Sequence, residues 1–230
     1  GSEVFDAAGY RTGVFNQSPT WIDEGILFDG DNECIRSLPA QQIPQSGSIA
    51  MGFRSAVAFD TYQYLWVIGD TSNNDDYSKF SAYTDGGTGE WWFRIDGSYK
   101  ELNTPSTHDG IYHNLVWTWD KPSEYRGLYV DGAVEDEETG SLGSWPSLSA
   151  SEYLYYGGRY ASGDRYCSGV IAYFYIFDDV LPPEKIQLLN QDPYAMFRRR
   201  TPVYSFYSAG GGGGISIPVA MRTFRNLRCG

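Results

Sequence analysis

Residues 113–132 read HNLVWTWDKPSEYRGLYVDG, and this stretch decides the fold class. In its first half, apolar Leu115, Trp117 and Trp119 occupy every second position, which is the period of a β-strand with one buried face. In its second half, Arg126–Val130 is another short apolar run, and it ends at an Asp-Gly pair that is typical of a tight hairpin turn. The stretch therefore predicts antiparallel strands joined by short turns.

The same pattern continues on both sides of this stretch. Short apolar and aromatic runs predict further strands at residues 48–53, 64–68, 80–83, 91–95, 152–156 and 170–177. A helical pattern occurs at Pro183–Gln191, where Ile186, Leu188 and Leu189 form one apolar stripe that we expect to cover one edge or end of a sheet. Because strands do not alternate with helices, the sequence favours an all-β antiparallel sandwich and argues against parallel nucleotide-binding folds.

Composition and charge divide the chain into two parts. Aromatic residues make up 17% of the 230 residues, which favours strands and disfavours disorder. The net charge is −12, yet residues 198–230 contain six arginines and no acidic residue. We therefore predict a β-sandwich domain at 1–197 and a basic, glycine-rich arm at 198–230. The acidic body is poorly suited to nucleic acid, because phosphate contacts need Lys and Arg, and no apolar run is long enough for a membrane-spanning helix.

The arm has the features of an assembly segment. Five consecutive glycines at 210–214 form a flexible hinge before a last apolar stretch. We expect the arm to leave the sandwich and to contact its own acidic body, an acidic partner or the sheet edge of a second copy, with RNA or DNA as the alternative anionic surface. The residues expected to make this contact are Arg198, Arg199, Arg200, Ile215, Ile217 and Phe224.

Three separated blocks resemble the laminin G-like jelly rolls of the concanavalin A-like lectin/glucanase superfamily. They are GILFDGDNECI (25–35), the stretch 113–132 with its LYVDG ending, and GVIAYFYIFDDVLPPEKI (169–186). The resemblance implies a two-sheet antiparallel jelly-roll β-sandwich with one short C-terminal helix and an extended tail, in which Gly169 allows two backbones to approach closely. The stretch NQDPYAMF (190–197) also resembles the endings of such domains in bacteriophage structural proteins.

Oxygen-bearing side chains follow the first block. Asp29, Asp31 and Asn32 supply carboxylate and amide oxygens within one turn, and calcium binds through such ligands. The resemblance implies a structural calcium near this turn, with a late acidic ligand at Asp178 or its neighbour. A second candidate is the acidic loop 70–76. The alternative is an Asx-rich turn whose side chains bond to their own backbone.

The cysteines do not define a disulfide framework, because there are three of them without a repeated spacing. Cys34 and Cys167 either form a bridge or behave as two small hydrophobic residues in strands. At least one cysteine is left unpaired.

Sugar binding needs flat aromatic rings with polar groups beside them. The loop 157–168 (GGRYASGDRYCS) has the composition of a surface binding loop, although a plain connecting loop is the alternative. Alternation along the strands sends half of the aromatic residues to the core. The residues expected to bind carbohydrate are Trp91, Trp92, Arg94, Arg159, Tyr160, Asp164 and Tyr166, and Tyr153, Tyr155 and Asn114 are further candidates.

Acidic and histidine residues raise an enzymatic alternative. Glycosidases of the related jelly roll carry acids at positions i, i+2 and i+5 of one strand, and residues 135–138 (EDEE) approach this pattern, but Gly140 occupies the last position. A solvated acidic hairpin end is the other interpretation. Polysaccharide lyases of the fold need a catalytic histidine, whereas His108 lies in a loop and His113 begins a strand.

These patterns predict a non-catalytic, lectin-like structural or adhesion module on a phage virion, as a capsid-decoration or tail-fibre protein, or on an extracellular surface. Its expected partners are a glycan or a virion protein and further copies of itself. We expect no nucleic acid, no membrane insertion and no cofactor other than calcium. The alternatives are a glycoside hydrolase or polysaccharide lyase on the same fold, and a laminin G-type domain of a host cell.

Overall fold

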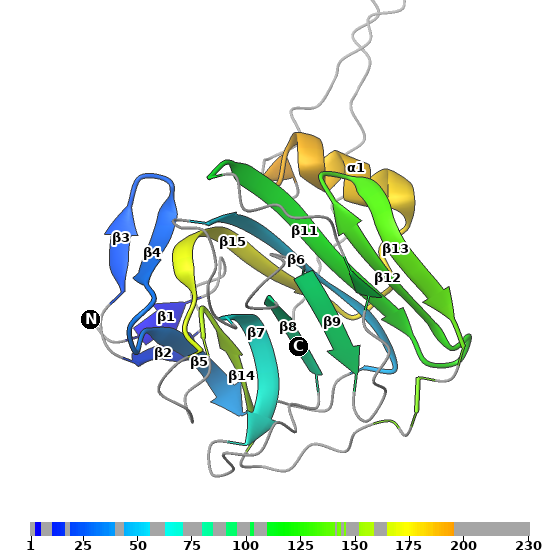
Figure 1. The fold of residues 1–230 in the computed structure, drawn as a ribbon, viewed down its shortest axis with the longest axis horizontal. Coiled ribbons are helices and arrows are strands. Elements are labelled where there is room, and N and C mark those ends of the chain that lie inside the picture. Colours follow the sequence, from blue (N-terminus) through cyan, green and yellow to red (C-terminus); the bar gives the residue numbers. More distant parts are fainter. Residues whose placement is uncertain are drawn as a thin grey trace, which may run out of the picture. The chain divides into compact units, whose positions relative to one another are not determined.

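Figure 1 shows a computed structural model of the chain. The structure describes residues 3–5, 11–16, 19–39, 44–55, 63–70, 80–84, 91–95, 102–103, 110–140, 142–143, 145, 152–158 and 165–195. The chain divides into two compact units, Gly1–Phe197 and Arg198–Gly230, and every described residue belongs to the first. The six assembly residues of the arm therefore lie outside the described residues.

One sheet has seven antiparallel strands in the order β13-β12-β11-β6-β15-β4-β3. The stretch that decides the fold class forms its β11–β12 pair, in which Leu115 lies opposite Val130. The strands are β3 (Thr20–Ile22), β4 (Gly25–Asp29), β6 (Ser46–Ser55), β11 (Tyr112–Asp120), β12 (Tyr125–Val130), β13 (Ala133–Thr139) and β15 (Ser168–Phe177).

The other sheet has eight antiparallel strands in the order β1-β2-β5-β14-β7-β8-β9-β10. They are β1 (Glu3–Phe5), β2 (Arg11–Asn16), β5 (Cys34–Pro39), β7 (Gln63–Asp70), β8 (Phe80–Thr84), β9 (Trp91–Ile95), β10 (Leu102–Asn103) and β14 (Glu152–Tyr156). The predicted all-β, two-sheet antiparallel sandwich is confirmed.

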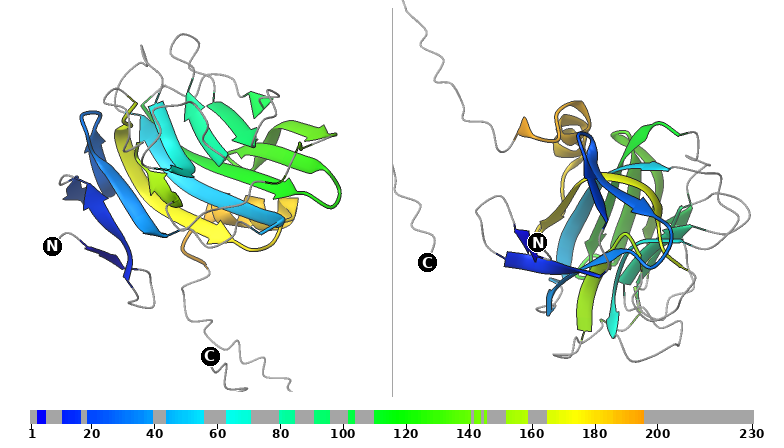
Figure 2. Two further views of the ribbon diagram at one scale, coloured as in Figure 1. Left: turned by 90° about the horizontal axis from the view of Figure 1, so that it is seen from below. Right: turned by 90° about the vertical axis from the view of Figure 1, so that its left-hand side faces the viewer.

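The core lies between the two sheets, which face each other as layers (Figure 2). The predicted alternation along β11 is confirmed, because Leu115, Trp117 and Trp119 are at most 1% exposed and lie in this core, whereas Val116 packs in a second cluster on the outer side. Trp117 meets Trp66 of the opposite sheet edge-on, with ring centroids 5.6 Å apart. Edge-to-face contacts of this kind stabilise aromatic cores beyond the area that they bury.

The helix α1 (Pro183–Gln191) packs on the outer face of the seven-stranded sheet (Figure 2). Ile186 and Leu189 are buried there with Tyr129, whereas Leu188 is 53% exposed. The expectation that the helix covers a sheet edge or end is therefore wrong, because the outer face of this sheet is itself apolar and needs a cover. Within the described part of the chain, no helix is both long and apolar enough to span a membrane.

Two positions depend on unusual backbone geometry. An added Cβ at Gly169 would lie 2.4 Å from the backbone oxygen of Arg54, which confirms the predicted close approach. In the β12–β13 turn, Asp131 and Gly132 both have positive φ, at 51° and 83°. Such a two-residue turn suits the right-handed twist of its strands, as the Asp-Gly pair predicted.

Candidate functional site

The outer face of the eight-stranded sheet carries a group of aromatic side chains, which we call the outer aromatic cluster. Its members come from β7, β8, β9 and β14 and from the segment before β15, and they are Tyr64, Tyr83, Trp92, Tyr153, Tyr155 and Tyr166. Ring centroids are 5.5 Å apart between Tyr64 and Tyr83, and 5.6 Å apart between Tyr83 and Trp92. Three neighbouring strands therefore contribute one continuous row of rings.

The outer aromatic cluster has a buried floor and a partly exposed rim. Tyr64, Tyr83, Tyr155 and Tyr166 are at most 9% exposed. Trp92 is only partly buried, and so is Tyr153 on β14. The rim residues face solvent in part, and they pack against the buried floor.

Arginines accompany the rings on this face. The guanidinium carbon of Arg36, on β5, lies 4.8 Å from the ring centroid of Tyr153. Arg165 Nη1 donates a hydrogen bond of 3.2 Å to Tyr64 Oη, and Arg94 lies two residues after Trp92 on β9. Cation–π contact fixes a guanidinium over a ring and leaves its N–H donors at the edge of its plane.

Burial raises the pKa of the Tyr155 phenol, and the positive charge of Arg36 opposes this rise. The phenol therefore stays neutral at physiological pH. The charge of this face comes from its arginines and not from its tyrosines.

Cross-strand pairing aligns two of these arginines in one row across the sheet. Arg36 lies opposite Tyr155, Tyr155 opposite Val67, Val67 opposite Ser81, and Ser81 opposite Arg94. Directly opposed residues point to the same side of a sheet. The row crosses four interstrand spacings, or about 19 Å.

The structure separates the predicted sugar-binding residues. Trp91 is 1% exposed and packs edge-on against Phe53 in the core, so its ring has no face for a sugar and its assignment to the site is corrected. Trp92 and Arg94 lie on the outer face and are partly exposed, and Tyr166 belongs to the buried floor. Three predicted residues lie outside the described residues: Arg159, Tyr160 and Asp164.

The sequence did not reveal four members of this face: Arg36, Tyr64, Tyr83 and Arg165. Alternation was the available signal for Arg36, because buried Ile35 beside it fixes the direction of its side chain. Its partner strand β14 follows more than a hundred residues later, so the sequence does not show that Arg36 meets Tyr153.

The turn after β4 has the hydrogen bonds of an Asx-rich turn, which was the alternative interpretation to a calcium site. Asp31 N donates a hydrogen bond of 2.8 Å to Asp29 Oδ1, and Asn32 Nδ2 donates one of 2.6 Å to Asp31 Oδ1. The side-chain oxygens thus stabilise their own turn, with Asn32 at a φ of 67°.

The four predicted calcium ligands do not form one coordination sphere. Asp29 lies opposite Ser168, the first residue of β15, whereas Asp178 follows the last residue of that ten-residue strand. An extended strand of this length separates its ends by roughly 30 Å. The described residues contain no group of three His, Cys, Asp or Glu that fits a metal ion. Asp178 is therefore removed from the predicted calcium ligands of this turn. Residues 71–76 of the second candidate site lie outside the described residues. Calcium binding stays a prediction.

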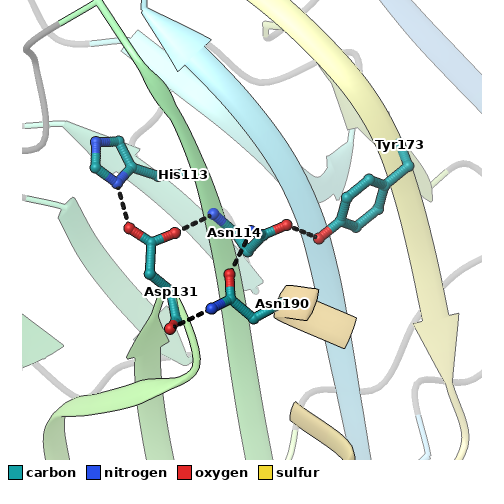
Figure 3. A network of polar contacts seen from close by, with 5 residues as sticks. All are labelled: His113, Asn114, Asp131, Tyr173 and Asn190. Carbon is teal, nitrogen blue, oxygen red and sulfur yellow. Dashed lines mark hydrogen bonds and ion pairs between the residues drawn. The ribbon is translucent and has the colours of Figure 1, made fainter. Parts of the chain in front are cut away.

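His113 and Asn114 belong to a polar network that holds α1 against the seven-stranded sheet (Figure 3). His113 Nδ1 lies 2.7 Å from Asp131 Oδ2, and Asn114 N donates to Asp131 Oδ1 over 2.8 Å. Asn114 Nδ2 donates to Asn190 Oδ1, and Tyr173 Oη donates to Asn114 Oδ1, both over 2.6 Å. These residues connect β11, β15 and α1 on the opposite side of the domain from the outer aromatic cluster, so Asn114 is not a sugar ligand of that cluster.

The predicted acidic pair lies on β13, the edge strand of the seven-stranded sheet. Val134 and Asp136 oppose consecutive residues of β12, so Glu135 is the extra residue of a β-bulge. Glu135 and Glu137 are exposed, and Glu138 pairs with buried Arg126. Charged side chains on an edge strand oppose edge-to-edge aggregation, which is the solvated interpretation of this segment.

Cys34 and Cys167 are buried and form no disulfide with each other. Cys34 packs in the outer aromatic cluster, whereas Cys167 lies in the core between the sheets, where burial raises the pKa of its thiol. Both behave as small hydrophobic residues.

The fold and the aromatic outer face define a lectin-type β-sandwich. The family model described as the concanavalin A-like lectin/glucanases superfamily matches residues 35–187, and the chain belongs to this family. The predicted resemblance to laminin G-like domains is thereby confirmed.

Curated relatives match a limited part of the chain. A mouse protein named Sushi, von Willebrand factor type A, EGF and pentraxin domain-containing protein 1 is 28% identical over 111 residues, and its rat counterpart is 27% identical. The mouse alignment covers 43% of this chain and 3% of the relative. The chain thus corresponds to a small fraction of that protein's length.

Solved structures share the fold at low identity. The Ruminococcus gnavus IT-sialidase CBM40 bound to α2,3 sialyllactose has a TM-score of 0.60 and 14% identity, with 75% of this chain and 99% of that chain covered. Trypanosoma rangeli sialidase in complex with sialic acid has a TM-score of 0.62 and 14% identity over 77% of this chain and 29% of that chain. A heptameric SAP-like pentraxin from Limulus polyphemus has a TM-score of 0.54 and 12% identity, covering 76% and 80%.

Proposed function

We propose that this domain is a non-catalytic glycan-binding module and that the rim of the outer aromatic cluster binds the sugar. One observation carries the proposal: two partly exposed rings each have an arginine beside them, Trp92 with Arg94 and Tyr153 with Arg36. Ring faces stack on the apolar faces of sugars, and guanidinium groups donate hydrogen bonds to sugar oxygens.

The family and one structural neighbour support the proposal. The chain belongs to a superfamily that is described by its lectins and glucanases. The Ruminococcus gnavus CBM40 that shares the fold is described in complex with α2,3 sialyllactose. The sialidase matches cover only 29% of that chain, so they give no reason to assign hydrolysis to this one.

The positions of the described acids argue against a glycosidase that uses two carboxyl groups. Most glycoside hydrolases place two such groups about 5–9.5 Å apart beside the substrate, whereas sialidases use a tyrosine nucleophile. No described residue that points outward from the eight-stranded sheet is Asp or Glu, and the predicted pair is on the far edge strand β13. His113, the described histidine, is held by Asp131.

Direct binding measurements test the proposal. A glycan array, followed by calorimetry with α2,3 sialyllactose and lactose as first probes, should identify a ligand. Trp92→Ala and Tyr153→Ala should each weaken its binding by about tenfold, the effect of losing about 1.4 kcal/mol of stacking.

Trp21→Ala is the matched control, because Trp21 is 64% exposed on β3 of the other sheet. It should leave the affinity unchanged. Thermal unfolding of each variant separates lost contact from lost fold. Unchanged affinity in both folded rim variants, or an array without any bound glycan, would contradict the proposal.

We also propose that the domain is a bacteriophage structural or adhesion component whose arm, residues 198–230, mediates assembly with further copies or a virion protein. The supports are the likeness of residues 190–197 to phage-domain endings and the six arginines of the arm against an acidic body. Ending the chain after Phe197 should leave the first unit folded and reduce its oligomeric state in light scattering coupled to size-exclusion chromatography. An unchanged oligomer would rule out the arm as the assembly element.

A further inference from the structure

We infer that the glycan bound at this rim is anionic and that Arg36 holds its negatively charged group. This inference rests on the proposed function, because it specifies the ligand class of the same site. The ligand chemistry is a carboxylate or sulfate group on a sugar. The observations that carry it are the placement and the pairing of the arginines.

Three cations elsewhere in the described structure have carboxylate partners. Arg54 pairs with Glu24, Lys121 with Glu124, and buried Arg126 with Glu138. Such pairs are expected in a chain with 29 acidic and 17 basic residues. Each of these three cations is therefore neutralised by the protein itself.

Arg36 departs from this arrangement. Among the residues that the structure describes, no carboxylate lies within ion-pair distance of Arg36, and its side chain is partly buried over the ring of Tyr153. The ring face stabilises the cation in part, by about 0.5–2 kcal/mol. Stacking uses the face of the guanidinium, whereas a carboxylate or sulfate binds at its edge through two parallel N–H donors.

The rest of the outer face extends the positive character of the site. Arg94 ends the cross-strand row that begins at Arg36, and Arg165 lies against Tyr64. No described side chain that points outward from β5, β14, β7, β8 or β9 is acidic; these five strands lie next to one another in the sheet (Figure 1). A face with three arginines is complementary to a negatively charged ligand. A neutral ligand gains no such electrostatic attraction and should bind more weakly.

The cross-strand row also indicates the length of ligand that this face can bind. Arg36 and Arg94 are separated by about 19 Å of sheet, and Tyr155, Val67 and Ser81 lie between them in the row. A charged oligosaccharide lying across the strands can meet arginine at both ends. Arg36 is the member on which the inference depends, because it stacks on Tyr153 and no described carboxylate pairs with it.

Two pairs of polymers test the charge directly. The first pair is polygalacturonate and its fully methyl-esterified form, in which a methyl ester replaces each charged carboxylate. The second is dextran sulfate and dextran, which isolates sulfate as the source of charge. We expect at least one charged polymer to bind about tenfold or more tightly than its neutral counterpart, the effect of one charge-assisted hydrogen-bonding pair. This binding should weaken as salt is raised, because rim charges are screened.

Variants then assign the effect to Arg36. Arg36→Gln should lower affinity for the charged polymer by about tenfold, and Arg36→Lys should retain part of it, because Lys keeps the charge but not the planar pair of donors. Lys185→Gln removes the same charge from the exposed surface of α1 and should change nothing. Circular dichroism and thermal unfolding establish that each variant is folded.

The outcomes separate the inference from the proposed function. Equal binding of charged and neutral polymers, or unchanged affinity in folded Arg36→Gln, overturns the anionic inference and leaves glycan binding intact. Binding to none of the four polymers also overturns it, and the glycan array decides the proposed function independently.

Discussion

The two outer faces of the sandwich are built from the same kind of strand but serve different purposes. The outer face of the seven-stranded sheet is covered by α1, whose Ile186 and Leu189 are buried against it. The outer face of the eight-stranded sheet carries the outer aromatic cluster, with Trp92 and Tyr153 partly exposed. One outer face is therefore covered and contributes to stability, whereas the other leaves rim side chains partly exposed.

The two faces also differ in how their polar groups are satisfied. On the helix-covered face, the side-chain amide of Asn114 bonds to Asn190 and Tyr173, and the backbone N–H of Asn114 donates to Asp131 (Figure 3). At the rim of the aromatic face, the indole Nε1 of Trp92 is buried without a hydrogen-bond partner in the described structure. Buried donors without partners are rare in native proteins, and the core indoles of Trp66 and Trp117 are the other two such indoles in the described structure.

The largest effect that tests this comparison is expected on the helix-covered face. Ile186→Ala should lower the free energy of unfolding by about 2–5 kcal/mol, because it removes buried methyl groups and leaves a cavity under α1. Urea denaturation measures this change. Glycan affinity at a temperature where the variant is folded should stay unchanged, since the substitution is on the opposite sheet.

Leu188→Ala is the control for the same helix. Leu188 is 53% exposed, so its replacement should change stability by less than about 0.5 kcal/mol. Equal losses of unfolding free energy at Ile186 and Leu188 would show that the packing of α1 does not depend on its buried face.

An intermediate effect is expected in the network that fixes α1. Asn114→Ala leaves Tyr173 Oη and Asn190 without their partner and should cost about 1–3 kcal/mol. Tyr173→Phe removes one hydroxyl and should cost about 1 kcal/mol. The double variant should lose at least about 0.5 kcal/mol less than the sum of the two single changes, because both remove the same bond. Strict additivity in urea denaturation would contradict a shared network.

The sandwich itself was predictable from local patterns. Along β11 the alternation of Leu115, Trp117 and Trp119 already fixes which side chains enter the core, and the Asp-Gly pair fixes the next turn. The position of α1 was not predictable, because its apolar stripe shows that it packs but not on which surface. Leu188 illustrates this, since it belongs to the stripe in sequence yet remains exposed.

The proposed binding face was only partly predictable, because it depends on pairing between distant segments. In WWFRI, aromatic residues occupy both faces of the strand, so the sequence does not distinguish buried Trp91 from outward Trp92. Arg36 and Tyr155 meet only through the β5–β14 register. The same limit explains the error at Asp178, because a matching residue type says nothing about the end of the strand on which it lies.

The smallest effect is expected in the β4–β5 turn, where the chain passes from one sheet to the other. Glu33 is 8% exposed there and accepts a hydrogen bond of 2.8 Å from Asp29 N. Burial raises the pKa of Glu33 above its ordinary value, and the charges of Asp29 and Asp31 add to the rise. A carboxyl group whose pKa is raised on folding destabilises the folded state at higher pH, and this cost disappears as the pH falls through the raised pKa.

Glu33→Gln should therefore raise the free energy of unfolding at about pH 7 by up to about 1 kcal/mol, and the gain should vanish toward about pH 4. Asp120→Asn supplies a control of opposite sign, because hydrogen bonds from Ser123 and Ser46 lower the pKa of Asp120. Asp120 contributes stability above its unfolded pKa that is lost as the pH falls through the folded one, so this variant should lose a few tenths of a kcal/mol at neutral pH. Urea denaturation at the two pH values measures both changes. A loss of stability in Glu33→Gln at neutral pH would mean that the negative charge of Glu33 is itself needed in the turn between the sheets.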